Sequence, residues 1–319
     1  MASDPAGPPA LIADIGGTNA RFALVDSDKR ISAERVLSCM DYPDLVQAAA
    51  AYLRDTPGLR PRRAAVAVAT PITGDWIDLT NNHWSFSREA AQQALGLDQL
   101  LILNDFTALA RALPLLGPDE RRAVGGGTAV AETPIGLIGP GTGLGVSGLV
   151  WSGRRWIPLE TEGGHVTFSA CDEREWAVSR IIQQRFGHVS PERLLSGPGL
   201  VNLYHALAQV EGWSAENLQA AEITEYALSE SCWHCLEVVE MFCGMLGTAA
   251  GNLAITLGAR GGVYLGGGIV PRLGEFFARS PFRTRFEAKG RFSGYLAAIP
   301  TWVIIATHPA LRGAAAALD

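Results

Sequence analysis

The sequence predicts an α/β protein built from two related halves. Apolar strand patterns alternate with helical patterns along the chain, as expected for sheets that are covered by helices. A strand, a glycine turn and a second strand occur twice, at 11–25 and at 137–151. With 319 residues, the chain has the length of one large domain or of two. The repeated hairpin favours a duplicated fold whose halves hold a ligand from opposite sides.

The expected elements place a small domain before a large one. In the first third, we expect helices at 43–54 and 87–95 and strands at 10–14, 20–26, 31–38, 63–69 and 100–104. In the rest, we expect helices near 173–186, 198–210 and 230–257 and strands near 135–139, 145–151, 155–159, 262–266 and 301–306. The stretch Leu115–Gly127 has proline and glycine breaks with four charges and is the expected crossover. The domains would be 10–115 plus 306–319 (small) and 116–305 (large).

Composition and charge exclude several classes of protein. Hydrophobic residues make up 48% of the chain and charged residues 18%, as in folded globular proteins. The net charge of −6 argues against nucleic acid or an anionic membrane as a partner. We expect no membrane span, because no apolar run approaches about 18 residues. Residues 1–9 lack the regions of a signal peptide, and five cysteines, an odd number, favour a reducing cytoplasm.

The first hairpin has the composition of a phosphate-binding loop. The strand that ends at Asp14 is followed by Gly16, Gly17 and Thr18 and then by a second strand, which is typical of a hairpin. Glycines let backbone N–H groups approach a phosphate without interference from a Cβ atom. A carboxylate at the strand end can hold Mg²⁺ through water. An ordinary tight turn is the alternative for this loop taken alone.

The second hairpin repeats the pattern without the carboxylate. Its turn contains Gly141, Thr142 and Gly143, and Gly139 stands where the first hairpin has Asp14. Residues 143–148 match G-x-G-x-x-G, but a strand follows them, whereas the dinucleotide fingerprint opens a helix. A Walker loop is excluded because neither of the two lysines of the chain lies in a glycine loop. Only the first half would therefore carry a metal ion.

Two polar side chains follow the strand expected at 100–104. Asn104 and Asp105 stand where this buried strand ends and a helix begins, and ligands of open α/β sheets lie outside such strand ends. Asp105 taken alone is as well explained as a helix N-cap. The amide of Asn104 both donates and accepts hydrogen bonds, which suits a polyol ligand.

Three further side chains are candidates for the same kind of ligand. Glu162 and His165 stand on either side of a Gly-Gly bend and can converge on one point. Ser190 and Pro191, which precede Glu192, have the pattern of an N-cap and a first helical position. A glutamate is favoured in the first turn of a helix, so its presence here is explained without a bound ligand. The local reading is therefore favoured for Glu192.

The cysteines are not arranged as a zinc finger. Residues 232–235 form a C-x-x-C pattern, but no second ligand pair follows at zinc-finger spacing. Cys243 stands eight residues later in the same apolar helical stretch. Small buried thiols on a helix face are the favoured interpretation.

Taken together, these segments resemble the bacterial glucokinases, sugar kinases of the hexokinase and actin-like ATPase fold, a duplicated ribonuclease H-like fold of two lobes with a cleft between them. The resemblance covers Leu11 to Gly313 and includes four further runs, namely 71–76, 80–84, 195–204 and 266–272. It implies ATP-dependent phosphorylation of glucose at its 6-hydroxyl by a cytoplasmic homodimer, with ATP and Mg²⁺ as cofactors.

The resemblance also implies roles for individual residues. Asp105 is similar to the catalytic aspartate that accepts the hydroxyl proton. The sugar-hydroxyl ligands would be Asn104, Glu162, His165 and Glu192. The first phosphate loop would comprise Ala13, Asp14, Ile15, Gly16, Gly17 and Thr18, with Asp14 at the Mg²⁺. The second loop would comprise Gly141, Thr142 and Gly143, and Gly267 and Gly268 would begin a helix beside the adenosine.

The sequence departs from neighbouring families in two respects and leaves two alternative functions open. Repressor-type sugar kinases have a cysteine-rich zinc motif after the Glu-x-Gly-His segment, whereas only Cys171 follows here, and no helix-turn-helix precedes the first hairpin. We therefore expect neither structural zinc nor DNA binding. A kinase of another hexose, such as mannose or an N-acetyl hexosamine, is one alternative. A non-catalytic sugar sensor is the other, although the presence of Asp14 and Asp105 argues against it.

Overall fold

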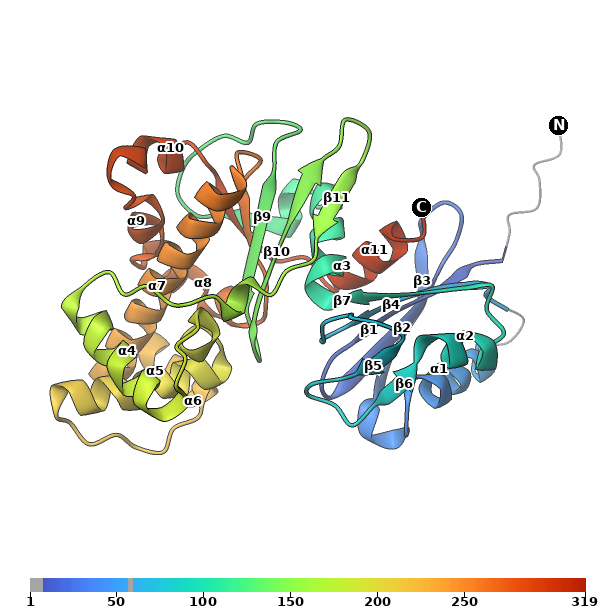
Figure 1. Ribbon diagram of the computed structural model, residues 1–319, viewed down its shortest axis with the longest axis horizontal. Helices are drawn as coiled ribbons and strands as arrows, with labels where there is room; N and C mark the ends of the chain where they lie inside the picture. Colours follow the sequence, from blue (N-terminus) through green and yellow to red (C-terminus); the bar gives the residue numbers. More distant parts are fainter. Residues whose placement is uncertain (1–7, 57–59) are drawn as a thin grey trace. The chain divides into compact units, whose positions relative to one another are not determined.

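The computed structural model describes residues 8–56 and 60–319 and divides the chain into two compact units (Figure 1). The first unit contains the described residues up to Leu116 together with Ala306–Asp319, and the second contains Gly117–Ile305. The two units have closely related sheets.

A five-stranded mixed sheet with the order β3-β2-β1-β4-β7 forms the centre of the first unit. Its strands are β1 (Ala10–Ile15), β2 (Asn19–Val25), β3 (Ile31–Ser38), β4 (Arg63–Val68) and β7 (Gln99–Asn104). Strands β1, β4 and β7 are parallel, whereas β2 and β3 are antiparallel to their neighbours. The sequence expectation for all five strands is confirmed within two residues at each end.

Helices cover both faces of this sheet. Alternate side chains of a strand point to opposite faces, so Leu11, Ala13 and Ile15 pack in the core beneath α1 (Leu45–Arg54) and α2 (Arg88–Ala94). Ile12 packs instead against α11 (Pro309–Ala316), which lies against α3 (Asp105–Ala112). The C-terminal helix thus completes the core of the first unit.

The second unit contains a six-stranded sheet with the order β11-β10-β9-β12-β13-β8. Its strands are β8 (Arg121–Ala123), β9 (Ile135–Pro140), β10 (Leu144–Trp151), β11 (Trp156–Leu159), β12 (Val263–Leu265) and β13 (Thr301–Ile304). In each sheet, three antiparallel strands are followed by two strands parallel to the first. The expected duplication is therefore confirmed, and β8 is an added edge strand.

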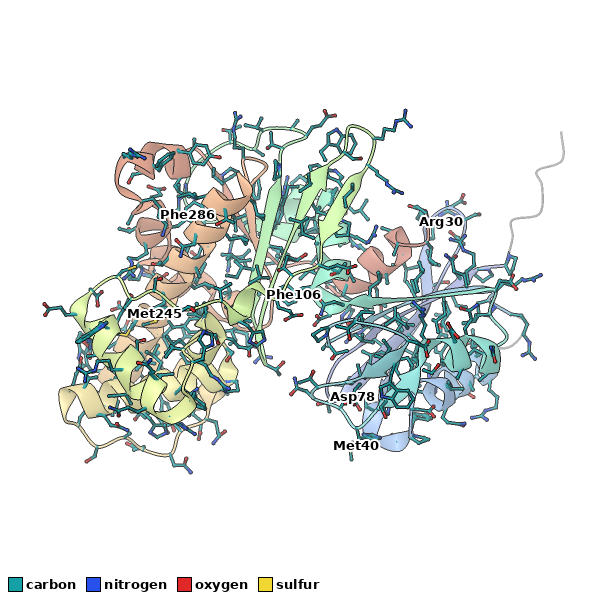
Figure 2. The ribbon with its side chains drawn as sticks, in the orientation of Figure 1. Arg30, Met40, Asp78, Phe106, Met245 and Phe286 are labelled. Carbon is teal, nitrogen blue, oxygen red and sulfur yellow. The ribbon has the colours of Figure 1, made fainter. Side chains whose placement is uncertain are left out.

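Seven α-helices accompany this sheet in the described part of the second unit: α4 (Glu173–Phe186), α5 (Gly197–Glu211), α6 (Ala220–Leu228), α7 (Trp233–Leu257), α8 (Ile269–Arg279), α9 (Phe282–Glu287) and α10 (Ser293–Ala297). Met245 of α7 and Phe286 of α9 lie in their common core (Figure 2). The expected helices near 173–186, 198–210 and 230–257 are confirmed as α4, α5 and α7.

Helix α7 requires a correction of one expectation. An 18-residue window of this 25-residue helix has a mean hydropathy of 1.5, so one helix of the described residues is long and apolar enough to cross a membrane, although the sequence analysis found no apolar run of that length. Within the second unit, 67% of its apolar window is buried, and it packs against α5, α6, α9 and β9. Its apolar composition is thus explained by its position in a protein core.

Three short strands and helices α6, α9 and α10 were not expected from the sequence. Strands β5 (Trp76–Asp78) and β6 (Ser85–Ser87) form a two-stranded hairpin, and β8 has three residues. Strands of this length carry almost no periodicity.

The helix start expected at Ser190 and Pro191 is only a 3₁₀ turn, Pro191–Arg193, and α5 begins after it at Gly197.

Candidate active site

The parallel strands of the first unit bring the two predicted carboxylates to one edge of its sheet. Ile15, Val68 and Asn104 are in register on β1, β4 and β7. Asp14 therefore lies one residue before this line and Asp105 one residue after it, separated by β4. Neighbouring strands are about 4.8 Å apart, so the two residues border the same stretch of the carboxyl edge. This is where open α/β sheets bind ligands.

Hydrogen bonds from two other segments fix the conformation of the first glycine loop. The Gly16 N–H donates to the Asn19 carbonyl at 3.0 Å and closes the turn, while the side-chain amide of Asn82 donates to the Gly16 carbonyl at 3.2 Å. The Cys39 N–H donates to the Thr18 carbonyl at 2.8 Å. Gly17 and Thr18 themselves are exposed. A Cβ atom at Gly17 would lie 2.8 Å from the Asn81 carbonyl oxygen.

Asp14 is half-buried beside this loop and has a cationic neighbour. Its carboxylate lies 3.6 Å from the Arg21 guanidinium, directly across the β1–β2 pair. Burial raises the pKa of Asp14, and the charges of Arg21 and His308 oppose this effect. A cation beside this carboxylate would stabilise the negative charge that burial disfavours. Phosphate sites hold Mg²⁺ through one or two carboxylates, waters and substrate oxygens, so Asp14 fits this ion.

At the end of β7, the roles of the two polar residues differ from the simplest expectation. Asn104, not Asp105, is the N-cap of α3: its side-chain oxygen accepts from the N–H groups of Phe106 at 2.9 Å and Thr107 at 3.2 Å. The Asn104 amide also donates to the Thr70 carbonyl at 3.3 Å. Asp105 is the first residue of α3, and its Oδ1 accepts from the Phe106 N–H at 2.8 Å.

In the second unit, three predicted side chains converge. His165 lies between two carboxylates, with its Nε2 3.9 Å from Glu162 and its Nδ1 3.8 Å from Glu192. A 3₁₀ turn, Gly163–His165, makes this possible, because its buried Gly164 packs against the start of β10, where a Cβ atom would overlap the Leu144 carbonyl. Glu162 and His165 are more than half exposed and Glu192 is 30% exposed.

Glu192 also contacts the second glycine loop. Its Oε2 accepts from the Leu144 N–H at 2.9 Å, and a Cβ atom at Gly143 would lie 2.5 Å from this oxygen. The loop itself is closed by the Gly141 N–H, which donates to the Gly143 carbonyl at 2.8 Å. The Gly197 N–H at the start of α5 donates to the Gly141 carbonyl, also at 2.8 Å. The local interpretation of Glu192 was therefore incomplete.

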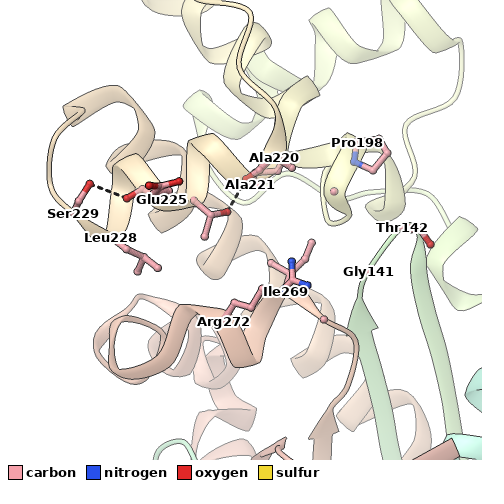
Figure 3. Close-up of a pocket in the computed structure, with 14 residues that line it drawn as sticks. Gly141, Thr142, Pro198, Ala220, Ala221, Glu225, Leu228, Ser229, Ile269 and Arg272 are labelled. Carbon is pink, nitrogen blue, oxygen red and sulfur yellow. Dashed lines mark hydrogen bonds between the residues drawn. The ribbon is translucent and has the colours of Figure 1, made fainter. Parts of the chain in front are cut away.

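The second glycine loop borders a cavity of about 920 Å³ that lies wholly within the second unit (Figure 3). Helices α6 and α8 form opposite walls, and Gly141 and Thr142 lie at the turn beside them. The loop before α8 approaches β9 closely, because a Cβ atom at Gly139 would lie 2.5 Å from the Gly266 carbonyl carbon. At Gly267, with a φ of +75°, a Cβ atom would overlap the Pro140 carbonyl.

Part of the cavity wall was missed in the sequence analysis. The wall includes Thr224, Glu225 and Leu228 of α6, Ser229 beyond it, and Ile269 and Arg272 of α8. Helix α6 is short, and its apolar positions Ile223 and Ala227, four residues apart, are its only strong sequence signal. Arg272 stands four residues after Gly268 in the matching run 266–272, which could have indicated it.

Two glycine hairpins on duplicated sheets, with a carboxylate at a strand end of the first, define a protein of the actin-like ATPase fold. A family model described as Glucokinase matches residues 11–319, and the chain belongs to this glucokinase family. It is 55% identical to a glucokinase of Aromatoleum aromaticum over 313 residues, 98% of this chain and 95% of that protein. A glucokinase of Neisseria meningitidis is 51% identical over 322 residues, 100% and 98% of the two chains.

A solved structure agrees with this assignment. The crystal structure of a glucokinase from an Antarctic psychrotroph matches with a TM-score of 0.88 and 38% identity, over 98% of each chain. The resemblance found in the sequence is thereby confirmed, as is the expected fold.

Proposed function

We propose that this chain is a glucokinase that transfers the γ-phosphoryl group of ATP to the 6-hydroxyl of glucose. The observation that carries the proposal is the convergence of Glu162, His165 and Glu192, with Glu192 bonded to the second glycine loop at Leu144. The side chains that we propose as sugar ligands and a loop of the phosphate-binding type thus belong to one unit and are joined by this hydrogen bond. Membership of the glucokinase family supports the same reaction.

The three convergent side chains have the chemistry of a sugar site. Carboxylates accept two hydrogen bonds or more, and an imidazole donates from one nitrogen and accepts on the other. Vicinal hydroxyl groups need acceptors and donors together. Glu162 and His165 are exposed, so both can exchange water for sugar hydroxyls without breaking a buried bond.

The glycine loops and the cavity suit a nucleotide. Gly17 and Thr18 present exposed backbone in the first unit, and Gly141 and Thr142 border the cavity in the second. A volume of about 920 Å³ is ample for a nucleoside, because ligand pockets measure about 300–1,000 Å³. Backbone N–H groups then do what a lysine does in a Walker loop, namely neutralise phosphate oxygens.

Asp105 is the proposed acceptor of the hydroxyl proton. Phosphoryl transfer passes through a loose transition state that needs little covalent chemistry from the protein, so orientation and charge stabilisation dominate. Asp105 orients the 6-hydroxyl and takes its proton. Asn104 is proposed as a sugar ligand too, with its amide group as the donor, because its side-chain oxygen already caps α3. Arg21, beside Asp14, adds positive charge near the first loop.

Three further features belong to the proposal. Asp14 would hold Mg²⁺, which supplies charge neutralisation for the phosphates when bound. Cytoplasmic location is supported by five cysteines that are all free thiols. A homodimer is implied by the family resemblance alone, and sedimentation of the purified protein measures it directly.

A coupled assay of glucose, mannose and N-acetyl hexosamines tests the function, with ATP or polyphosphate as donor and with or without Mg²⁺. The expected result is the highest kcat/KM with glucose and ATP and dependence on Mg²⁺. A higher kcat/KM with another hexose would assign a different kinase. Sugar binding by calorimetry without turnover on any hexose would identify a sensor.

A further inference from the structure

Two cysteines at the start of α7 are placed together in a way that the proposed reaction does not use. Cys232 is the N-cap of this 25-residue helix, and its sulfur accepts from the Cys235 N–H at 3.4 Å. The Cys235 side chain is completely buried, whereas Cys232 is half-buried.

Cys235 and Cys243 are buried, as the sequence favoured, whereas Cys232 at the start of the helix is only half-buried. Cysteines of Cys-x-x-Cys motifs at helix N-termini are those that exchange with disulfides and react with oxidants. Disulfides join Cα atoms about 4.4–6.8 Å apart, a span that this spacing reaches at a helix start. A partly exposed first thiol and a buried second thiol are what stepwise oxidation requires.

We propose that Cys232 and Cys235 form a reversible redox site that reacts with small-molecule disulfides and acts on the nucleotide cavity. The Cys232 thiolate attacks one sulfur of the small disulfide, which forms a mixed disulfide and releases one thiolate. The Cys235 sulfur then attacks Cys232, breaks the mixed disulfide and releases the second thiolate. Two protein thiols lose two electrons, the small disulfide gains them, and its two thiolates take up the two protons.

Neighbouring contacts hold the second thiol in place for this step. The His234 ring stacks on Trp213 with a centroid distance of 4.1 Å and an angle of 12°, and Trp213 meets Tyr204 edge-on at 5.0 Å. This cluster fixes the start of α7 against the end of α5. Burial and the adjacent Cys232 raise the pKa of Cys235 to about 12, so Cys232 is the thiol that reacts first.

The connection to the cavity runs through the turn between α6 and α7. The Cys232 N–H donates to the Tyr226 carbonyl at 3.4 Å, and the Ser231 N–H donates to the same carbonyl at 3.1 Å. Glu230 in this turn has a φ of +55°, which is unfavourable for a residue with a Cβ atom. Ser229 and Leu228 line the cavity. A disulfide changes the Cys232 rotamer and therefore the position of this turn and of the adjoining wall.

Thiol mapping of the full chain tests the site without reference to activity. The reduced protein is equilibrated in glutathione buffers of rising oxidised fraction, quenched with acid, alkylated and analysed by mass spectrometry. We expect Cys232 and Cys235 to lose alkylation together, to appear as one crosslinked peptide and to recover with dithiothreitol. Cys235→Ala should instead accumulate glutathione on Cys232. If both thiols of the wild type stay free over the whole range, the redox site does not exist.

Two further variants serve as controls. Cys232→Ser should form no disulfide yet fold normally, because serine is a favoured N-cap. Cys171→Ser removes the exposed lone thiol and should behave like the wild type. Glutathione attached only to Cys171, with Cys232 and Cys235 unmodified, would overturn the proposal.

The effect on the cavity rests on the proposed glucokinase function and is measured separately. Oxidation should raise the KM for ATP about fivefold or more and leave the KM for glucose unchanged, and Cys232→Ser should abolish the effect. A disulfide that forms without any change in the KM for ATP would contradict the control of the cavity. Absence of kinase activity would refute the function and leave the thiol result standing.

Discussion

The carboxylate of Glu192 accepts a hydrogen bond from the backbone N–H of Leu144 at 2.9 Å. One oxygen of this side chain therefore supports the second glycine loop, and the other lies 3.8 Å from His165 in the proposed sugar site. The same residue is in a position to affect the binding of both substrates. This double role yields the first prediction.

Glu192→Ala should raise the KM for glucose and the KM for ATP, each about tenfold or more. The Leu144 N–H would lose its partner, at a cost of about 1–3 kcal/mol, and space would open beside Gly143. Glu192→Gln keeps an acceptor oxygen for Leu144 and should raise only the KM for glucose. Glu162 lies beside His165, and Glu162→Gln should likewise raise only the KM for glucose. Steady-state kinetics with each substrate varied in turn checks this, and an unchanged KM for ATP in Glu192→Ala would remove the link to the loop.

Asp105→Asn should lower kcat by about 10²–10⁴-fold and leave glucose binding intact. Asparagine has nearly the same shape and can still accept from the Phe106 N–H, so α3 should begin unchanged. The variant loses the ability to take a proton. Turnover is measured beside calorimetric binding of glucose and the melting temperature. Turnover near that of the wild type would reject the proposed role of Asp105.

Asp14→Asn should abolish use of Mg²⁺-ATP and yet stabilise the protein at neutral pH. Because burial raises the pKa of Asp14 above 3.8, the folded state keeps a proton that the unfolded state releases. Wild-type stability from this group therefore falls as the pH rises from 3.8 through the raised pKa, and then stays constant. The difference between the two proteins should be absent below pH 3.8 and full above the raised pKa. Denaturation over this pH range measures it, and a less stable variant at neutral pH would contradict the sign.

Gly313→Ala should destabilise the first unit even though it lies within a helix. Alanine is favoured over glycine in a helix by about 1 kcal/mol, but a Cβ atom here would overlap the Ala108 carbonyl of α3. Overpacking typically costs about 1–3 kcal/mol and occasionally more, so packing should outweigh propensity. Gly74→Ala, in a bend of the same unit, is a control for the substitution without overlap, since a Cβ atom there meets nothing within 4 Å. Equal melting temperatures for the two variants would show that α3 and α11 can move apart at little cost in stability.

Much of the fold follows from local patterns. The two glycine hairpins, the apolar strands and the long helices carry strong periodicity, and all of them lie where the sequence placed them. Strands β5, β6 and β8 and helices α6, α9 and α10 were missed, because such short segments depend on neighbours for their stability. Arg272 was missed for a related reason: it becomes a cavity residue only when α6 packs opposite α8.

The candidate site was predictable in its residue types but less so in its contacts. Asn104 and Asp105 are adjacent, and only the backbone geometry decided that Asn104 caps α3. The sequence around Glu192 offered a local explanation, whereas its partner Leu144 lies 48 positions away. Likewise, the pattern at Cys232 and Cys235 did not reveal which thiol is buried.

The sequence by itself determined the α/β class, the duplication and the family, because periodicity and motif order are properties of the chain. Only the tertiary structure decided that Glu192 bonds the second glycine loop, that α6 forms a cavity wall and that Cys232 is accessible. The physical reason is that hydrogen bonds and burial between distant segments depend on how the strands align and the helices pack, and local patterns do not encode that alignment.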